Sequence, residues 1–198
     1  MVKTVASRLA QSTGQAGEGF QWEVSLIQDG KVNAFCLPAG KIVVYTGILR
    51  VARNDAALAT VLGHEMAHAT SRHGAQRVFQ QNLTQTAHTG VAVSLSDMDY
   101  NEQRAVMGPL GPRAQFGVLM PFSRKHESEA DEIGLTYMAR AGFDREESLR
   151  FWQNGRGKRT RRRTAGVSFH ASSHQTCIQQ LQAWMPKALE EYHRAIGR

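Results

Sequence analysis

The sequence predicts an α+β fold that is mostly helical, with a small antiparallel sheet just before one central helix. Between residues 21 and 45, apolar and polar residues alternate or form short β-branched runs, which is typical of strands. After residue 54, apolar residues recur every three or four positions over long stretches, as they do on one face of a helix. A length of 198 residues suits one domain over 1–198 with its own hydrophobic core.

Three strands are expected in the first quarter of the chain. Residues 21–26 alternate in polarity, and residues 33–36 and 41–45 flank a turn at Pro38-Ala39-Gly40. The free edge of such a sheet can pair with an extended peptide, while alternate side chains of the peptide enter pockets. A sheet that serves only the fold is the alternative.

The central helix carries the pattern His-Glu-x-x-His at residues 64–68, and Asn54 is a suitable N-cap for it. Because His64 and His68 are four residues apart, both imidazoles point the same way from adjacent turns and could bind one zinc ion at about 2.0–2.1 Å. Glu65 lies about 100° round the helix, where it could take a proton from a water on the metal. Taken alone, the pattern is also compatible with two surface histidines.

A second helix is predicted from Lys125 to Ala141, with Glu127 and Asp131 in its apolar stripe. An unpaired carboxylate is costly there, and a metal ion with a histidine N–H would remove that cost. Catalytic zinc usually has three protein ligands and a water. We therefore assign Glu127 as the third zinc ligand and Asp131 as the acceptor that fixes a liganding histidine. Two rim carboxylates satisfied by water or arginine are the alternative.

Residues 90–117 include Met-Gly-Pro-Leu-Gly-Pro, which predicts a long loop or a broken helix. A long loop beside an active site could act as a mobile lid. No run of 18 or more apolar residues occurs, so we expect no transmembrane segment.

In these residues the chain resembles the zinc metallopeptidase family of HtpX, the CAAX prenyl endopeptidase and mitochondrial Oma-type proteases, and most of all its periplasmic BepA/LoiP-like branch. The family pattern, H-E-x-x-H followed by E-x-x-A-D, stands here at residues 64–68 and 127–131. Further matches are residues 32–38, 45–47 and 121–124. The resemblance covers about residues 20–152 and resumes near Ser173.

The resemblance implies a minigluzincin-like metallopeptidase domain with one zinc ion, which cleaves misfolded or envelope proteins. It also implies that the sheet edge guides substrate, which makes Asn33, Ala34 and Phe35 candidate substrate-binding residues. Relatives of this branch lie in the periplasm or at the outer membrane. No signal peptide opens this sequence, so we expect a cytoplasmic protein as written, or a truncated one.

The resemblance is interrupted at residues 154–172. Relatives carry Ser-Thr-His-Pro before the last helix, whereas Ala171 stands here in place of that histidine. His170 and His174 flank the position out of register, and either could serve as an extra ligand or oxyanion partner. Codons can be chosen that encode Ser-Thr-His-Pro when read one nucleotide later. A reading-frame artefact is therefore one hypothesis, and a genuine basic loop is the other.

The net charge of +7 is concentrated in this interruption. Residues 156–163 hold six basic residues, and the remaining 18 basic residues nearly balance 17 acidic ones. The run has no interleaved aromatic residues, so we expect no nucleic-acid partner. The sequence thus predicts a zinc endopeptidase that acts on polypeptides. The alternatives are an inactive, metal-binding, chaperone-like quality-control module, or a basic protein that binds nucleic acid or a membrane surface.

Overall fold

The computed structural model describes residues 1–114, 120–155 and 174–197. They form two compact units, one made of residues 1–72 and of the described residues from 127 onward, the other of residues 73–126. Helices dominate, and one small sheet precedes the central helix. The prediction of a mostly helical α+β fold is therefore confirmed. The assignment of residues 1–198 to a single metallopeptidase domain stays a prediction.

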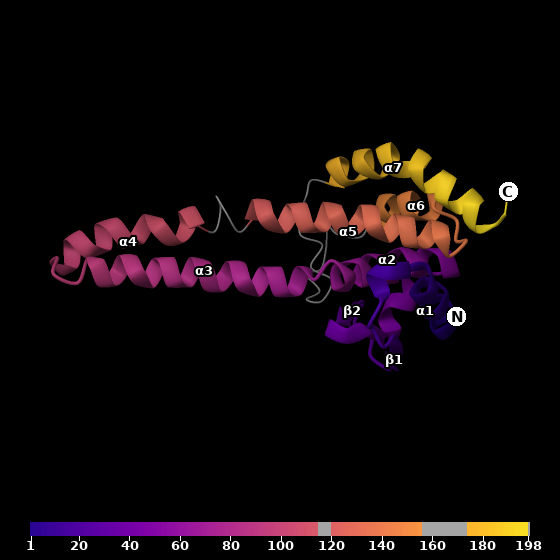
Figure 1. Ribbon diagram of the computed structural model, residues 1–198, viewed down its shortest axis with the longest axis horizontal. Helices are drawn as coiled ribbons and strands as arrows, with labels where there is room; N and C mark the ends of the chain where they lie inside the picture. The colour runs from indigo at the N-terminus through magenta and orange to yellow at the C-terminus, as the bar shows by residue number, and fades with distance from the viewer. Residues whose placement is uncertain (115–119, 156–173, 198) are drawn as a thin grey trace. The chain divides into compact units, whose positions relative to one another are not determined.

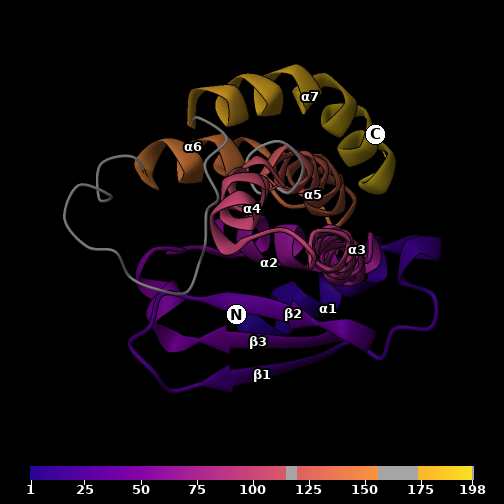
Figure 2. The ribbon, with the colours of Figure 1, turned by 90° about the vertical axis from the view of Figure 1, so that its left-hand side faces the viewer.

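The sheet of the first unit contains β1 Glu23–Ile27, β2 Ala34–Leu37 and β3 Lys41–Tyr45 in the order β1-β3-β2. Figure 2 shows β3 between the other two strands. β2 pairs antiparallel with β3 across the short 3-10 turn Pro38–Gly40. β1, however, runs parallel to β3, so the prediction of a wholly antiparallel sheet is wrong. Because the tight hairpin places β2 on one side of β3, the other side of β3 is left for β1. The chain reverses direction between β1 and β2 and again between β2 and β3, so β1 and β3 run the same way.

Helix α2, Asp55–Thr70, is the centre of the first unit. Every residue from 57 to 63 is buried, because α1, Val2–Ser12, the sheet and α6 pack around it. Its start follows the expectation from sequence: the Asn54 side-chain oxygen accepts a hydrogen bond from the Ala57 N–H at 2.7 Å. That bond satisfies one of the backbone donors that a helix start leaves unpaired.

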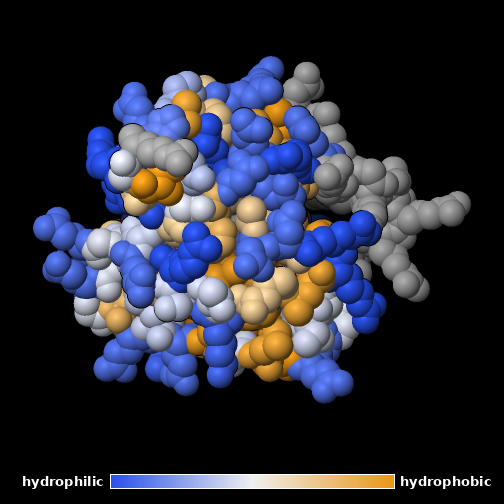
Figure 3. All heavy atoms as spheres, turned by 90° about the vertical axis from the view of Figure 1, so that its right-hand side faces the viewer, coloured by the Kyte–Doolittle hydropathy of each residue, from blue (hydrophilic) through white to orange (hydrophobic). Residues whose placement is uncertain are grey.

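Three further helices complete the first unit. They are α5 Met120–Arg140, of which residues from 127 belong here, α6 Glu146–Gly155 and α7 His174–Ala195. A second apolar cluster holds them together, made of Leu135, Ala139, Leu181 and Ala188. Within this unit the sheet, α2, the α5/α6 pair and α7 follow one another as layers (Figure 1). The face of the molecule in Figure 3 is covered mostly by hydrophilic side chains.

The second unit is built from α3 His73–Ser94, α4 Tyr100–Ala114 and the first residues of α5. Of the two alternatives for residues 90–117, the long loop is wrong, because α3 and α4 are joined by a short turn and Pro109 lies inside α4. The rings of His73 and His126 stack at 4.2 Å, and His126 Nε2 lies 2.8 Å from Gln76 Oε1. None of the described helices is long and apolar enough to span a membrane.

The cap of α2 gives a test of this fold. We expect Asn54→Ala to lower the free energy of unfolding by about 1 kcal/mol, since the helix start loses its side-chain acceptor. Asn54→Ser is the matched control: it keeps an acceptor and removes only the exposed hydrogen bond from Asn54 to Glu147. Urea titration gives the free energy of unfolding of both variants and of the parent chain. Equal destabilisation by the two would show that the Glu147 contact, and not the cap, stabilises this helix.

Candidate metal centre

His64 and His68 project from adjacent turns of α2 and meet at their tips. Their Nε2 atoms lie 3.0 Å apart, and the two rings stand edge to face at 4.6 Å between centroids. The helix dictates this meeting, because residues four apart lie one above the other on the same face. The motif helix is packed on nearly all sides, so neither histidine stands on an open surface.

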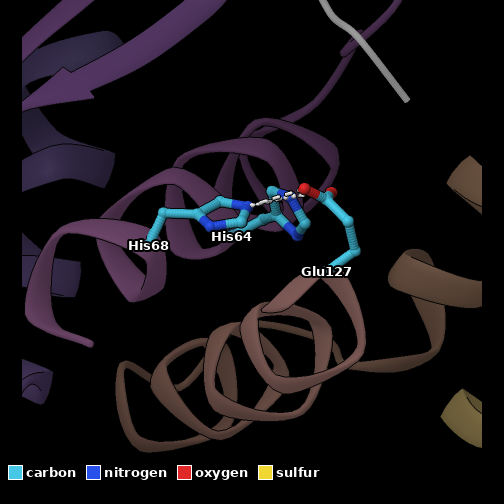
Figure 4. Close-up of side chains that lie close together, drawn as sticks. All are labelled: His64, His68 and Glu127. Atoms are coloured by element: carbon cyan, nitrogen blue, oxygen red, sulfur yellow. Dashed lines mark hydrogen bonds and ion pairs between the residues drawn. The ribbon is translucent and has the colours of Figure 1, made fainter. Parts of the chain in front are cut away.

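Glu127 reaches the same point from α5, as Figure 4 shows. Its Oε2 lies 3.5 Å from His64 Nε2 and its Oε1 lies 3.6 Å from His68 Nε2. One ligand atom from each of the three side chains falls within 4.8 Å of the others. Among the described residues, these three form the one group of His, Cys, Asp or Glu side chains that could hold a metal ion.

Asp131 lies one turn further along α5 and contacts the other ring nitrogen of His64. Its Oδ1 is 2.9 Å from His64 Nδ1, and the residue is only 9 % exposed. An ionised carboxylate can only accept, so Nδ1 carries the hydrogen and donates it to Asp131. In neutral His64 the lone pair is then on Nε2, the atom that faces His68 and Glu127.

The charges of this cluster depend on one another. Burial disfavours the charged form of His64, but its hydrogen bonds to Asp131 and Glu127 outweigh burial and raise its pKa well above the ordinary value. Burial also acts to raise the pKa of Glu127, yet hydrogen bonds from His64 and His68 hold that pKa far below the ordinary range. Without a metal, therefore, the cluster favours positive charge between the histidines and negative charge on Glu127.

This donor set fits a divalent cation. Two imidazole nitrogens and a carboxylate oxygen converge on one point, and that point favours a positive charge facing Glu127. A zinc ion could take the place of the proton there, since zinc binds neutral imidazole and ionised carboxylate. The three side chains expected from sequence as metal ligands thus lie within reach of one ion, and their role as zinc ligands stays a prediction.

Glu65 follows His64 and is only partly exposed. Burial raises the pKa of Glu65, and the negative charge of Glu127 raises it further. The charges of His64 and His68 lower this pKa but do not cancel the increase. Across from it, on β2, burial and the charge of Glu65 raise the pKa of the Cys36 thiol to about 12, so this thiol stays protonated. The charge of Glu65 thus acts on a residue of β2, one of the two edge strands of the sheet.

The three candidate substrate residues lie at the start of β2. The Asn33 carbonyl accepts a hydrogen bond from Tyr45 N–H at 3.0 Å. Ala34 is buried in the core, and the ring of Phe35 lies tilted against Tyr45 at 6.2 Å. The side chains of Ala34 and Phe35 thus pack within the sheet and its core, and the backbone of β2 is what we expect this edge to offer to a peptide. Of the two flanking histidines, His170 lies outside the described residues, as does the side chain of His174.

Two features of the site were not found by sequence reasoning. A small cavity lies behind His64 and Asp131, lined also by Thr60, Ser148 and Trp152, and the Trp152 ring lies 6.3 Å from the His64 ring. Gly63 and Gly134 bring the backbones of α2 and α5 into contact beside the histidines. Phe151 and Trp152 are apolar residues of α6 whose spacing in the sequence gives no sign that they approach His64.

Comparison with known proteins places this geometry in a family. The sequence model of Peptidase family M48 matches residues 1–189. The chain is 33% identical over 189 residues to the mitochondrial metalloendopeptidase OMA1 of Schizosaccharomyces pombe, an alignment that covers 94% of the chain and 53% of that protein. It is 43% identical over 127 residues to the protein of the same name from Arabidopsis thaliana, which covers 64% and 24%.

A bacterial relative matches as well. The beta-barrel assembly-enhancing protease of Yersinia pestis is 31% identical over 155 residues, which covers 77% of the chain and 31% of that protein. The chain therefore spans about half the length of the S. pombe relative, and less of the Arabidopsis and Yersinia relatives.

These relatives correct the expected localisation. OMA1 proteins of S. pombe, Arabidopsis, Saccharomyces cerevisiae and Danio rerio are named as mitochondrial. The placement in the periplasm or at the outer membrane is therefore wrong. It rested on short matches such as residues 32–38 and 121–124, whereas the alignment with the S. pombe OMA1 protein covers 94% of the chain. The resemblance to the family itself is confirmed: the chain belongs to Peptidase family M48.

Proposed function

We propose that this chain is a zinc-dependent endopeptidase that hydrolyses peptide bonds of unfolded or misfolded polypeptides. The observation that carries the proposal is the convergence of His64, His68 and Glu127 on one point between α2 and α5. The relatives named as metalloendopeptidases support the same activity. Zinc is favoured over other metals because two imidazoles and one carboxylate are a common catalytic zinc set that leaves a position for water.

When bound, zinc would supply a Lewis acid that polarises the scissile carbonyl and makes a water molecule more acidic. The chain's own part in the reaction then falls to Glu65. Its carboxylate takes the proton of the attacking water and passes it to the leaving amine. Burial, which raises the pKa of Glu65, suits this task, because a base must hold the proton long enough to deliver it.

Asp131 is proposed to act through His64 and not on the substrate. By accepting from Nδ1–H at 2.9 Å, it holds the ring orientation and keeps the Nε2 lone pair available to the metal. Partners of this kind raise the basicity of a liganding histidine and fix its tautomer. Glu127 needs no such partner to present a lone pair, since both of its oxygens face the histidines.

The sheet edge supports the proposed substrate class. β2 forms one edge of the sheet and packs against α2, the helix that carries the histidines and Glu65. An extended peptide could pair with this edge through main-chain hydrogen bonds, which do not depend on the peptide's sequence. Unfolded polypeptides offer extended main chain over long stretches, whereas folded proteins do not.

The first test concerns the base. We expect Glu65→Gln to keep its zinc and to lose peptide cleavage by about 10²–10⁴-fold, since general-base catalysis contributes that much. Cleavage of casein and zinc content per chain are measured on the same samples. Glu190→Gln, a change at an exposed position of α7, is the control and should match the parent.

Residual activity of Glu65→Gln above about one hundredth of the parent would remove Glu65 from its role. A parent chain that binds zinc stoichiometrically but cleaves nothing would favour the inactive, chaperone-like alternative. That outcome would make residues 154–172 the next segment to test, because the resemblance read from sequence is interrupted there.

The second test concerns the third ligand. We expect Glu127→Ala to weaken zinc binding far more than Glu129→Ala, because Glu127 faces the histidines and Glu129 lies exposed on another face of α5. Competition with a chelating dye gives the zinc Kd of each variant. Comparable losses in the two variants would mean that the ligand from this helix is not Glu127.

A further inference from the structure

We propose that Gly63 and Gly134 are positioning residues for the metal centre: their contact sets how closely α2 and α5 approach, and so whether the groups of one helix reach those of the other. The inference rests on the proposed metal site. Gly63 directly precedes His64, and Gly134 follows Asp131 by three residues, so the contact lies beside the His64–Asp131 hydrogen bond.

The two backbones leave no room for a side chain at this point. A Cβ on Gly134 would lie 2.8 Å from His64 N and 3.0 Å from both Gly63 C and His64 Cα. A Cβ on Gly63 would lie 3.0 Å from the Gly134 carbonyl oxygen. All of these neighbours are backbone atoms of helices and cannot rotate away as a side chain could. Any larger residue must therefore separate or tilt the two helices.

The hydrogen bond between Asp131 and His64 is the part of the site most sensitive to that separation. Aspartate has a short side chain, and its Oδ1 already needs the present spacing to lie 2.9 Å from Nδ1. A displacement of about 1 Å would take this distance beyond hydrogen-bond range. Glu127 has one more rotatable bond and could follow the histidines, so Asp131 is the first group to lose contact.

Other contacts between the two helices oppose a simple adjustment. The Thr70 hydroxyl on α2 and the Tyr137 hydroxyl on α5 lie 3.0 Å apart, and Ala67 and Ala130 belong to the same buried apolar cluster. Because these contacts hold the helices together at other points, the two helices would have to tilt relative to each other to make room for a Cβ at Gly63 or Gly134. A tilt changes the directions of His64 and Asp131 as well as their distance.

Gly134→Ala tests the inference. We expect it to raise the zinc Kd about 10–100-fold, the range found when the partner of a liganding histidine is lost. Gly63→Ala should raise the Kd less, because its Cβ would meet one oxygen at 3.0 Å and no atom closer. The matched control is Gly90→Ala in the C-terminal part of α3, where a Cβ would meet nothing within 4 Å and the Kd should not change.

A double-mutant cycle separates positioning from general packing. In an Asp131→Asn background, Gly134→Ala should change the zinc Kd by no more than about twofold, since the bond through which it acts is already lost. The visible spectrum of the cobalt-substituted protein gives a second readout: Gly134→Ala and Asp131→Asn should alter the ligand-field bands in the same way. Thermal unfolding of the metal-free variants reports stability alone.

Two results would overturn the inference while leaving the proposed function intact. One is a Gly134→Ala protein with lower thermal stability but an unchanged zinc Kd. The other is a double variant in which the fold-change in zinc Kd equals the product of the fold-changes of Gly134→Ala and Asp131→Asn measured singly. If Gly134→Ala does not fold, the same double-mutant cycle is measured with Gly63→Ala in its place. A parent chain that binds no zinc would instead overturn the proposed function, and the inference with it.

Discussion

The need to satisfy one buried and one partly buried carboxylate and two partly buried histidines at the same place constrains the rest of this structure. Burying any one of these groups alone would be unfavourable by several kcal/mol, on the order of the net stability of a domain. Together they satisfy one another: Asp131 accepts from His64, and Glu127 faces both histidines. This works only if α2 and α5 lie side by side in register, which explains why their crossing has room for glycine alone.

The position of α2 follows from the same need. A helix carrying His64, Glu65 and His68 must be covered on most sides for its charges to interact strongly, yet one side must stay open to a peptide. The sheet, α1 and α6 cover it, and β2 provides the neighbouring edge. Asn54 caps the start of the helix. The apolar clusters of the first unit thus serve as the rigid support of a small polar site.

Much of this site could be predicted because helix geometry is local. Four-residue spacing places His64 beside His68. Because Glu127 and Asp131 fall in an apolar stripe, each is expected to have a partner, and in the structure both lie against the histidines. Strand direction is not local: alternation in β1 predicts a strand but neither the strand with which it pairs nor the direction of that pairing, so the parallel pairing with β3 was missed. The close approach at Gly134 was not predicted, because a residue without a side chain gives no sign in the sequence of what approaches it.

The measurement that tests this account most directly is zinc K-edge X-ray absorption on the protein loaded with zinc, combined with the metal content per chain. We predict one zinc per chain, coordinated by two imidazole nitrogens at about 2.0–2.1 Å and by oxygen ligands at about 2.0–2.2 Å. A spectrum without two imidazoles, or a chain that retains no zinc after dialysis, would contradict the claim that His64, His68 and Glu127 converge to hold a metal.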